Sequence, residues 1–214
     1  EKVKPQAFAE DDIIIRPTEK VVFLTLNRPG SMNDLHANMM RKIISAIDTQ
    51  KALVIEGSGD NFCMGWTSSS MNKHETTENI YQLYGELIKK MNKVTQPIVT
   101  ICKGVVFGGG MIFPCMSDIV IAENNAVFSF YENRLKQIPF ILSKAAQNRI
   151  KHSQIKKMFL IEKEADIEEA INMELVDISV PADKLEMEKK SVLRRINTLD
   201  PTVLKITKEN IKDA

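Results

Sequence analysis

Residues 101–130, ICKGVVFGGGMIFPCMSDIVIAENNAVFSF, decide the fold of this chain. A β-branched stretch runs into three consecutive glycines, Gly108 to Gly110, and then into a short apolar segment. Glycine costs about 0.5–1 kcal/mol relative to alanine inside regular structure, so three together mark a break beside the core. A strand followed by glycines and a helix start leaves backbone N–H groups without an internal partner. Alone, the glycines fit a tight turn and an anion site equally well.

Strands and helices alternate on both sides of this stretch. Apolar residues at helical spacing predict helices over 35–47, with Asn33 or Asp34 as the cap, and over 78–93. Helical patterns dominate from Phe140 onward. Short β-branched or apolar runs predict strands at 11–17, 21–29, 51–57, 97–104, 118–122, 126–130 and 175–180. This alternation indicates an α/β protein with a mostly parallel sheet and crossover helices.

Composition narrows the class of protein. The 214 residues are 43% hydrophobic and 27% charged, with a formal net charge of +1, which argues against a protein that coats nucleic acid. Three scattered cysteines predict reduced thiols. No apolar run reaches the roughly 18 residues that span a bilayer, and the first residues carry no signal-peptide core. We expect a soluble, cytoplasmic protein that binds neither nucleic acid nor membrane.

A second loop, NFCMGW at 61–66, also follows a predicted buried strand and also carries a glycine at a turn. Two such loops could each offer one N–H group to a single oxygen. This is how an enolate or oxyanion is held, and one well-placed donor is worth about 10²–10³ in rate. The dinucleotide and phosphate-loop patterns are absent, because neither G-x-G-x-x-G nor Lys-Ser/Thr follows the strand.

These motifs, NRP at 27–29, VIEGSGDNFCMGW at 54–66 and ICKGVVFGGGMIFPCMSDIVIAENNAVFSFYENRLKQIP at 101–139, resemble the enoyl-CoA hydratase/isomerase, or crotonase, superfamily. The match runs in order to about Val180. The resemblance implies a crotonase-like ββα spiral core at 1–180 and a shortened C-terminal helical trimerisation region at 181–214. It also implies an oxyanion hole formed by the backbone N–H groups of Met64 and Gly109.

The resemblance also indicates a reaction. Hydratases of this family use two glutamates; this chain has Ile112 at the first position and Glu132, in FYENRL, at the second. A carboxyl group in an apolar pocket has a raised pKa and can act as base and then as acid near neutral pH. Glu132 is therefore the predicted catalytic residue, with a solvated surface glutamate as the alternative.

Retention of Glu132 with loss of the other glutamate resembles the dehydratases of polyketide β-branching cassettes. These enzymes convert a 3-hydroxy-3-methylglutaryl group on an acyl carrier protein into a 3-methylglutaconyl group. The implied partners are an acyl carrier protein and further copies of the chain, as a homotrimer or a dimer of trimers. The substrate would be carried on phosphopantetheine or CoA, and no metal or redox cofactor is expected. Other crotonase reactions (decarboxylation, hydration or isomerisation) and a catalytically silent thioester-binding trimer remain open.

Further residues are assigned by their place in these motifs. Trp66, Ile112 and Tyr131 are expected to line the substrate pocket, and Trp66 and Thr67 depart from the family's usual small residue and aspartate. Arg41 and Lys42 could contact an acidic carrier protein, although a solvated helix face often carries such residues. The three histidines, His36, His74 and His152, share no metal-like spacing and are expected at the surface or in loops. No histidine is near Cys63 in sequence, so a nucleophilic thiol is not expected.

Overall fold

The computed structural model describes residues 12–66, 77–131 and 140–212, without the side chains of 77–79 and 212. Its centre is a six-stranded sheet in the order β1-β2-β3-β4-β6-β8. β1 pairs with β2 antiparallel, and every later neighbour is parallel. The strands are β1 (Ile13–Pro17), β2 (Val21–Leu26), β3 (Ala52–Gly57), β4 (Ile98–Cys102), β6 (Ile119–Glu123) and β8 (Ile178–Val180). The predicted mostly parallel sheet is confirmed.

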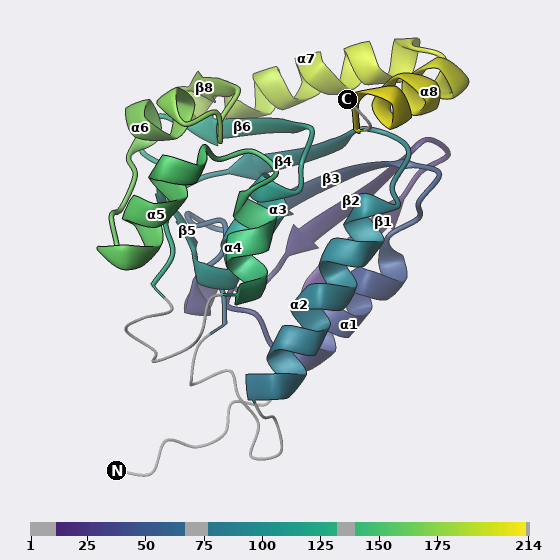
Figure 1. Cartoon of the computed structure of the whole chain (residues 1–214). Helices are drawn as coiled ribbons and strands as arrows, with labels where there is room; N and C mark the ends of the chain where they lie inside the picture. Colours follow the sequence, from purple (N-terminus) through teal and green to yellow (C-terminus); the bar gives the residue numbers. More distant parts are fainter. Residues whose placement is uncertain (1–11, 67–76, 132–139, 213–214) are drawn as a thin grey trace.

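Helices cover both faces of this sheet (Figure 1). The helices are α1 (Ala37–Ala46), α2 (Thr77–Asn92), α3 (Ile112–Cys115), α4 (Phe140–Ala146), α5 (His152–Leu160), α6 (Ile167–Asn172), α7 (Leu185–Thr198) and α8 (Pro201–Lys212). Side chains of a strand alternate between its two faces. In β3, Leu53 and Ile55 therefore join the core shared with α1 and α2, while Val54 joins a second core beneath α7.

Of the C-terminal helices, α7 lies over one face of the sheet, and α8 lies at the start of the interior strands β4 and β6. Val192, Leu193 and Ile196 of α7 are buried in the second core. α8 is held to the chain that precedes β4, because the Lys208 ammonium donates to the Gln96 carbonyl at 2.9 Å. In the described part of the chain no helix combines the length and the apolar character needed to cross a membrane. The division at residue 180 and the trimer remain predictions.

The glycine stretch forms a compact turn instead of a break. A two-stranded parallel sheet pairs β5 (Val105–Phe107) with β7 (Val127–Ser129). The 3₁₀ helix η3 (Gly108–Met111) follows β5 and leads directly into α3. All three glycines are buried. The wider prediction of a strand, a glycine turn and a short helix is confirmed.

The start of α1 differs from the prediction. His36, not Asn33 or Asp34, is the N-cap, and its Nδ1 accepts a hydrogen bond from the Met39 N–H at 3.4 Å. Asn33 has a φ of +54° and directs its side chain toward the loop that follows β3. The residues before α1 therefore support a neighbouring loop rather than the helix itself.

Candidate active site

The loop after β3 and the glycine turn lie against each other. The Cys63 N–H donates to the Val105 carbonyl at 3.0 Å, and the Phe107 N–H donates back to the Cys63 carbonyl at 2.9 Å. Gly65, with a φ of +78°, is so close to the turn that a methyl group built on it would lie 2.6 Å from the Gly109 nitrogen. The two glycine-bearing loops predicted to converge do converge.

The peptide planes of residues 63–66 point alternately in opposite directions. In a trans peptide the C=O of one residue and the N–H of the next point opposite ways. The Cys63 carbonyl faces Phe107, so the Met64 N–H faces away and donates to the Met32 carbonyl at 2.9 Å. This backbone N–H group is therefore already used, and the assignment of Met64 as an oxyanion donor has to be corrected.

The backbone N–H group of Trp66 is the better candidate for this donor. The Gly65 carbonyl accepts from the Leu35 N–H at 2.8 Å, which directs the Trp66 N–H away from that strand-like contact. Gly109 is the second residue of η3, where an N–H lacks an intrahelical partner. Within the described ranges, neither the Trp66 N–H nor the Gly109 N–H has a hydrogen-bond acceptor. The sequence missed Trp66 because peptide direction depends on a partner about thirty residues away.

Tyr131 joins this loop to the segment that carries the predicted acid. Its hydroxyl donates to the Met64 carbonyl and lies 3.5 Å from the Trp66 carbonyl. Its ring contacts Phe107 with a centroid distance of 5.9 Å. The sequence predicted Tyr131 as a pocket residue, and the structure shows that it contacts both converging loops. Glu132 is the next residue and lies outside the described residues.

Two aromatic side chains lie beside the two N–H groups. Trp66 and Tyr84 are each 3% exposed and form an edge-to-face pair with a centroid distance of 6.4 Å. The Tyr84 hydroxyl lies directly against the Cα of Gly109, since a methyl group built on Gly109 would overlap it. Tyr84 lies on α2, and its spacing in the sequence matches that of the other apolar residues on the buried face of this helix. Nothing in the sequence separated it from the core.

A buried charged network fixes the position of the N-terminal side of this site. Arg28 pairs with Asp34 at 3.0 Å and with Asp12 at 3.5 Å, and His36 Nε2 lies 2.8 Å from Asp12. The His36 ring was expected near the surface but is 2% exposed. Burial, reinforced by the positive charge of Arg28, lowers the pKa of His36. The ring is therefore neutral at pH 7, with Nδ1 accepting from Met39 and Nε2–H donating to Asp12.

Asn33 transmits this support to the loop after β3. Its side-chain amide donates to the carbonyls of Ser58 and Asn61 at 2.9 and 2.8 Å, and its carbonyl accepts from the Cys63 thiol at 3.2 Å. Burial raises the pKa of that thiol to about 12, so Cys63 is protonated at neutral pH and is not a nucleophile. The three cysteines are free, as predicted, and all are buried.

The comparisons with known proteins agree with this geometry. The family model described as enoyl-CoA hydratase/isomerase matches residues 16–214. The chain belongs to the enoyl-CoA hydratase/isomerase family.

Similarity extends to individual members of that family. The chain is 26% identical to the "Probable enoyl-CoA hydratase echA8" of Mycobacterium bovis, over 95% of this chain and 82% of the relative. It is 30% identical to the 1,2-epoxyphenylacetyl-CoA isomerase of Escherichia coli, over 60% and 54%. The structure of Pseudomonas aeruginosa AtuE superposes with a TM-score of 0.86 and 27% identity, covering 95% of this chain and 84% of that one. These matches support the crotonase-like fold and an enzyme of the hydratase/isomerase type.

The other predicted site residues of this family member lie in two places. Ile112 is fully buried at the first residue of α3, directly after η3, where it packs in the main core. Arg41 and Lys42 lie on the exposed side of α1, and the Arg41 guanidinium donates to Asn38 at 2.9 Å. Their contact with a carrier protein stays a prediction.

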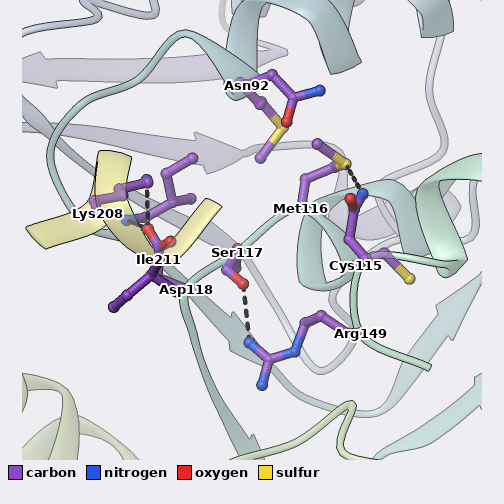
Figure 2. A pocket seen from close by; sticks show the side chains of 11 residues that line it. Asn92, Cys115, Met116, Ser117, Asp118, Arg149, Lys208 and Ile211 are labelled. Atoms are coloured by element: carbon purple, nitrogen blue, oxygen red, sulfur yellow. Dashed lines mark hydrogen bonds and ion pairs between the residues drawn. The ribbon is translucent and has the colours of Figure 1, made fainter. Parts of the chain in front are cut away.

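A separate cavity of about 320 Å³ lies at the junction of α8, α3 and the end of α2 (Figure 2). Its charged side chains are used within the protein. Lys208 pairs with Asp118 at 2.6 Å, and Arg149 donates to the Ser117 carbonyl at 2.9 Å and to Asp177 at 2.5 Å. These contacts fasten α8 and the segment after α4 to the sheet. Among the described residues no group of three or more His, Cys, Asp or Glu side chains could hold a metal ion.

Proposed function

We propose that this chain dehydrates a 3-hydroxy-3-methylglutaryl-type thioester, carried by an acyl carrier protein, to a 3-methylglutaconyl-type thioester in polyketide β-branching. The coarser statement, an enzyme of the enoyl-CoA hydratase/isomerase type, follows from the family. The finer one is supported by the residues retained and lost: Glu132 is present, and Ile112 stands where hydratases carry a second glutamate. The observation that carries the mechanism is the contact of Gly65 with Gly109.

That contact supports a site in which the N–H groups of Trp66 and Gly109, which have no acceptor among the described residues, act on one atom. In the proposed reaction they donate to the thioester carbonyl oxygen and stabilise the negative charge that develops when the C2 proton leaves. Glu132 removes that proton. The C3–O bond then breaks, the enolate electrons form the C2–C3 double bond, and Glu132 returns its proton to the departing hydroxyl as water.

One carboxyl group suffices for these steps, because elimination removes one proton from C2 and returns it to the departing hydroxyl. Tyr131 supports such a role for its neighbour. Its hydroxyl is bonded to the carbonyl of Met64, which ties the start of the acid-bearing segment to the loop that carries the Trp66 N–H. The carboxyl group of Glu132 and the N–H groups of Trp66 and Gly109 would then keep a fixed position relative to one another.

Isomerisation of an acyl thioester is the second candidate. The 30% identity to the 1,2-epoxyphenylacetyl-CoA isomerase favours it. A double-bond shift also needs only one proton shuttle and an enolate site. The two candidates differ in product mass, because isomerisation leaves the mass of the acyl group unchanged.

Substitution Glu132→Gln, with Glu164→Gln as the control at an exposed position, tests the proposal by mass spectrometry of carrier-bound acyl groups. We expect the native protein and the control to remove water from the 3-hydroxy-3-methylglutaryl group, and Glu132→Gln to lose at least about 10²-fold in rate. Loss of carbon dioxide, or an unchanged mass with a moved double bond, would replace dehydration by another crotonase reaction. Intact binding without any turnover would show a silent thioester-binding protein.

A further inference from the structure

The indole N–H of Trp66 is a buried donor without an acceptor among the described residues. Trp66 is 3% exposed, and no acceptor for its Nε1–H exists in the parts of the chain that the structure describes. More than about 90% of buried polar groups have a hydrogen-bond partner, and a buried tryptophan N–H normally finds one. An unpaired donor destabilises the fold, so its presence calls for a functional explanation.

The position of this indole gives that explanation. Trp66 directly follows Gly65, whose contact with Gly109 brings the two loops together, so the indole extends from the loop that would hold the thioester carbonyl. The ring packs edge-to-face on Tyr84, whose hydroxyl lies against Gly109. Trp66, Tyr84 and Gly109 therefore form one contiguous cluster around the place where the acyl group would attach.

We propose that the Trp66 indole N–H is a specificity-determining donor that binds an oxygen atom on the acyl chain of the substrate. The inference rests on the proposed function, because it requires an acyl thioester bound at the Trp66 and Gly109 N–H groups. It adds the group that recognises the acyl chain: the indole N–H binds an acceptor oxygen of that chain, from a hydroxyl or a carboxylate. A purely hydrocarbon chain leaves the indole unpaired and gains nothing from it.

The donor can be removed without changing the shape of the site. Trp66 is the sole tryptophan among the 214 residues. Growth with a benzothiophene analogue of tryptophan therefore replaces the indole N–H by sulfur at this one position. The same uniqueness gives a single indole N–H signal in a ¹⁵N-labelled sample, which reports binding without any need for turnover.

The experiment compares three probes, 3-hydroxybutyryl-CoA, glutaryl-CoA and butyryl-CoA, on the native and the sulfur-substituted protein. All three test the thioester site, while only the first two present an oxygen on the chain. We expect the sulfur substitution to lower the affinity for 3-hydroxybutyryl-CoA about 3–10-fold if the acceptor is a hydroxyl. If the acceptor is a carboxylate, we expect it to lower the affinity for glutaryl-CoA about 10–100-fold. Butyryl-CoA affinity should stay unchanged. The indole N–H resonance should move downfield with the oxygen-bearing probe only.

Two results overturn the inference in different ways. If the three probes bind and lose affinity equally, or not at all, on sulfur substitution, the indole only packs in the wall and the proposed function stands. If none of the three probes binds the native protein, both the inference and the proposed thioester site fail. The butyryl-CoA measurement separates the two cases.

Discussion

Substitution Gly65→Ala tests the two-loop site most directly. Gly65 has a φ of +78°, where an alanine costs about 1–2 kcal/mol. Its methyl group would lie 2.6 Å from the Gly109 nitrogen and 2.7 Å from the Phe107 carbonyl oxygen, both of which are backbone atoms. Overpacking of this kind costs about 1–3 kcal/mol more. The total, about 2–5 kcal/mol, is tolerable within a stability of about 5–15 kcal/mol, so the variant should fold at low temperature.

The catalytic rate should fall by more than the loss of folded protein explains. Relief of the overlap has to move the loop away from η3, which separates the N–H groups of Trp66 and Gly109. Loss of one such donor lowers the rate about 10²–10³-fold. The assay is mass-spectrometric exchange of the C2 protons of an acyl-CoA in D₂O, which detects enolate formation whatever the later steps. Chemical unfolding of the same samples gives the stability.

Two matched variants complete this test. Gly59→Ala adds a methyl group at a similar φ, +69°, but directs it at the Pro29 side chain, 2.7 Å away. Gly30→Ala meets no atom within 4 Å. Both variants should catalyse exchange of the C2 protons of the acyl-CoA at a rate within about threefold of the native rate. A native exchange rate in folded Gly65→Ala, or a loss of rate in Gly59→Ala as large as in Gly65→Ala, would exclude the contact of Gly65 with η3 as the basis of the donor site.

Two further predictions concern the groups that hold the site. Tyr131→Phe removes the hydroxyl that donates a hydrogen bond to the Met64 carbonyl. We expect the free energy of unfolding to fall by about 1–3 kcal/mol. We also expect a lower kcat with an unchanged KM, because the catalytic groups are held less firmly while the contacts to the thioester remain. A raised KM with an unchanged kcat would contradict this role. The second prediction is that the free energy of unfolding falls on acidification, because the pKa of His36 is lower in the folded chain than in the unfolded one. Below about pH 6.5 the unfolded chain binds a proton at this ring that the folded chain does not bind. Above that pH the ring is neutral in both the folded and the unfolded chain. We expect a loss of up to about 1.4 kcal/mol per pH unit below 6.5 in urea unfolding, much reduced in His36→Gln and retained in His152→Gln, whose side chain is exposed. Equal pH dependence in both variants would exclude His36 as the cause.

Much of the fold was predictable from local pattern. The continuous apolar run in residues 52–57 and the helical spacing of apolar residues in 78–93 are local patterns, which the chain displays without knowledge of any partner. The glycine turn was predictable for a similar reason, because a strand, three glycines and a short apolar segment leave few arrangements. The candidate acid Glu132 was found only through the motif, and its geometry lies outside the described residues.

The errors share a different physical origin. His36 is buried because it pairs with Asp12, twenty-four residues earlier in the chain, and nothing near position 36 signals that partner. Met64 was predicted from its place before the glycine of the motif, whereas the direction of the N–H groups of residues 64 and 66 depends on the Met32 carbonyl and the Leu35 N–H. Burial and peptide direction are fixed by long-range partners, so spacing along the chain cannot give them.

The same long-range contacts explain why the weak backbone is useful at this place. A glycine at position 65 allows the loop to approach η3 within a distance that any side chain would prevent. The Leu35 N–H then holds the Gly65 carbonyl, and peptide planarity turns the Trp66 N–H outward. The buried pair of Arg28 and Asp34 and the side chain of Asn33 keep residues 28–35 in place for that contact. The donor is thus positioned by atoms that never touch the substrate, and loosening any of them should lower turnover before it unfolds the protein.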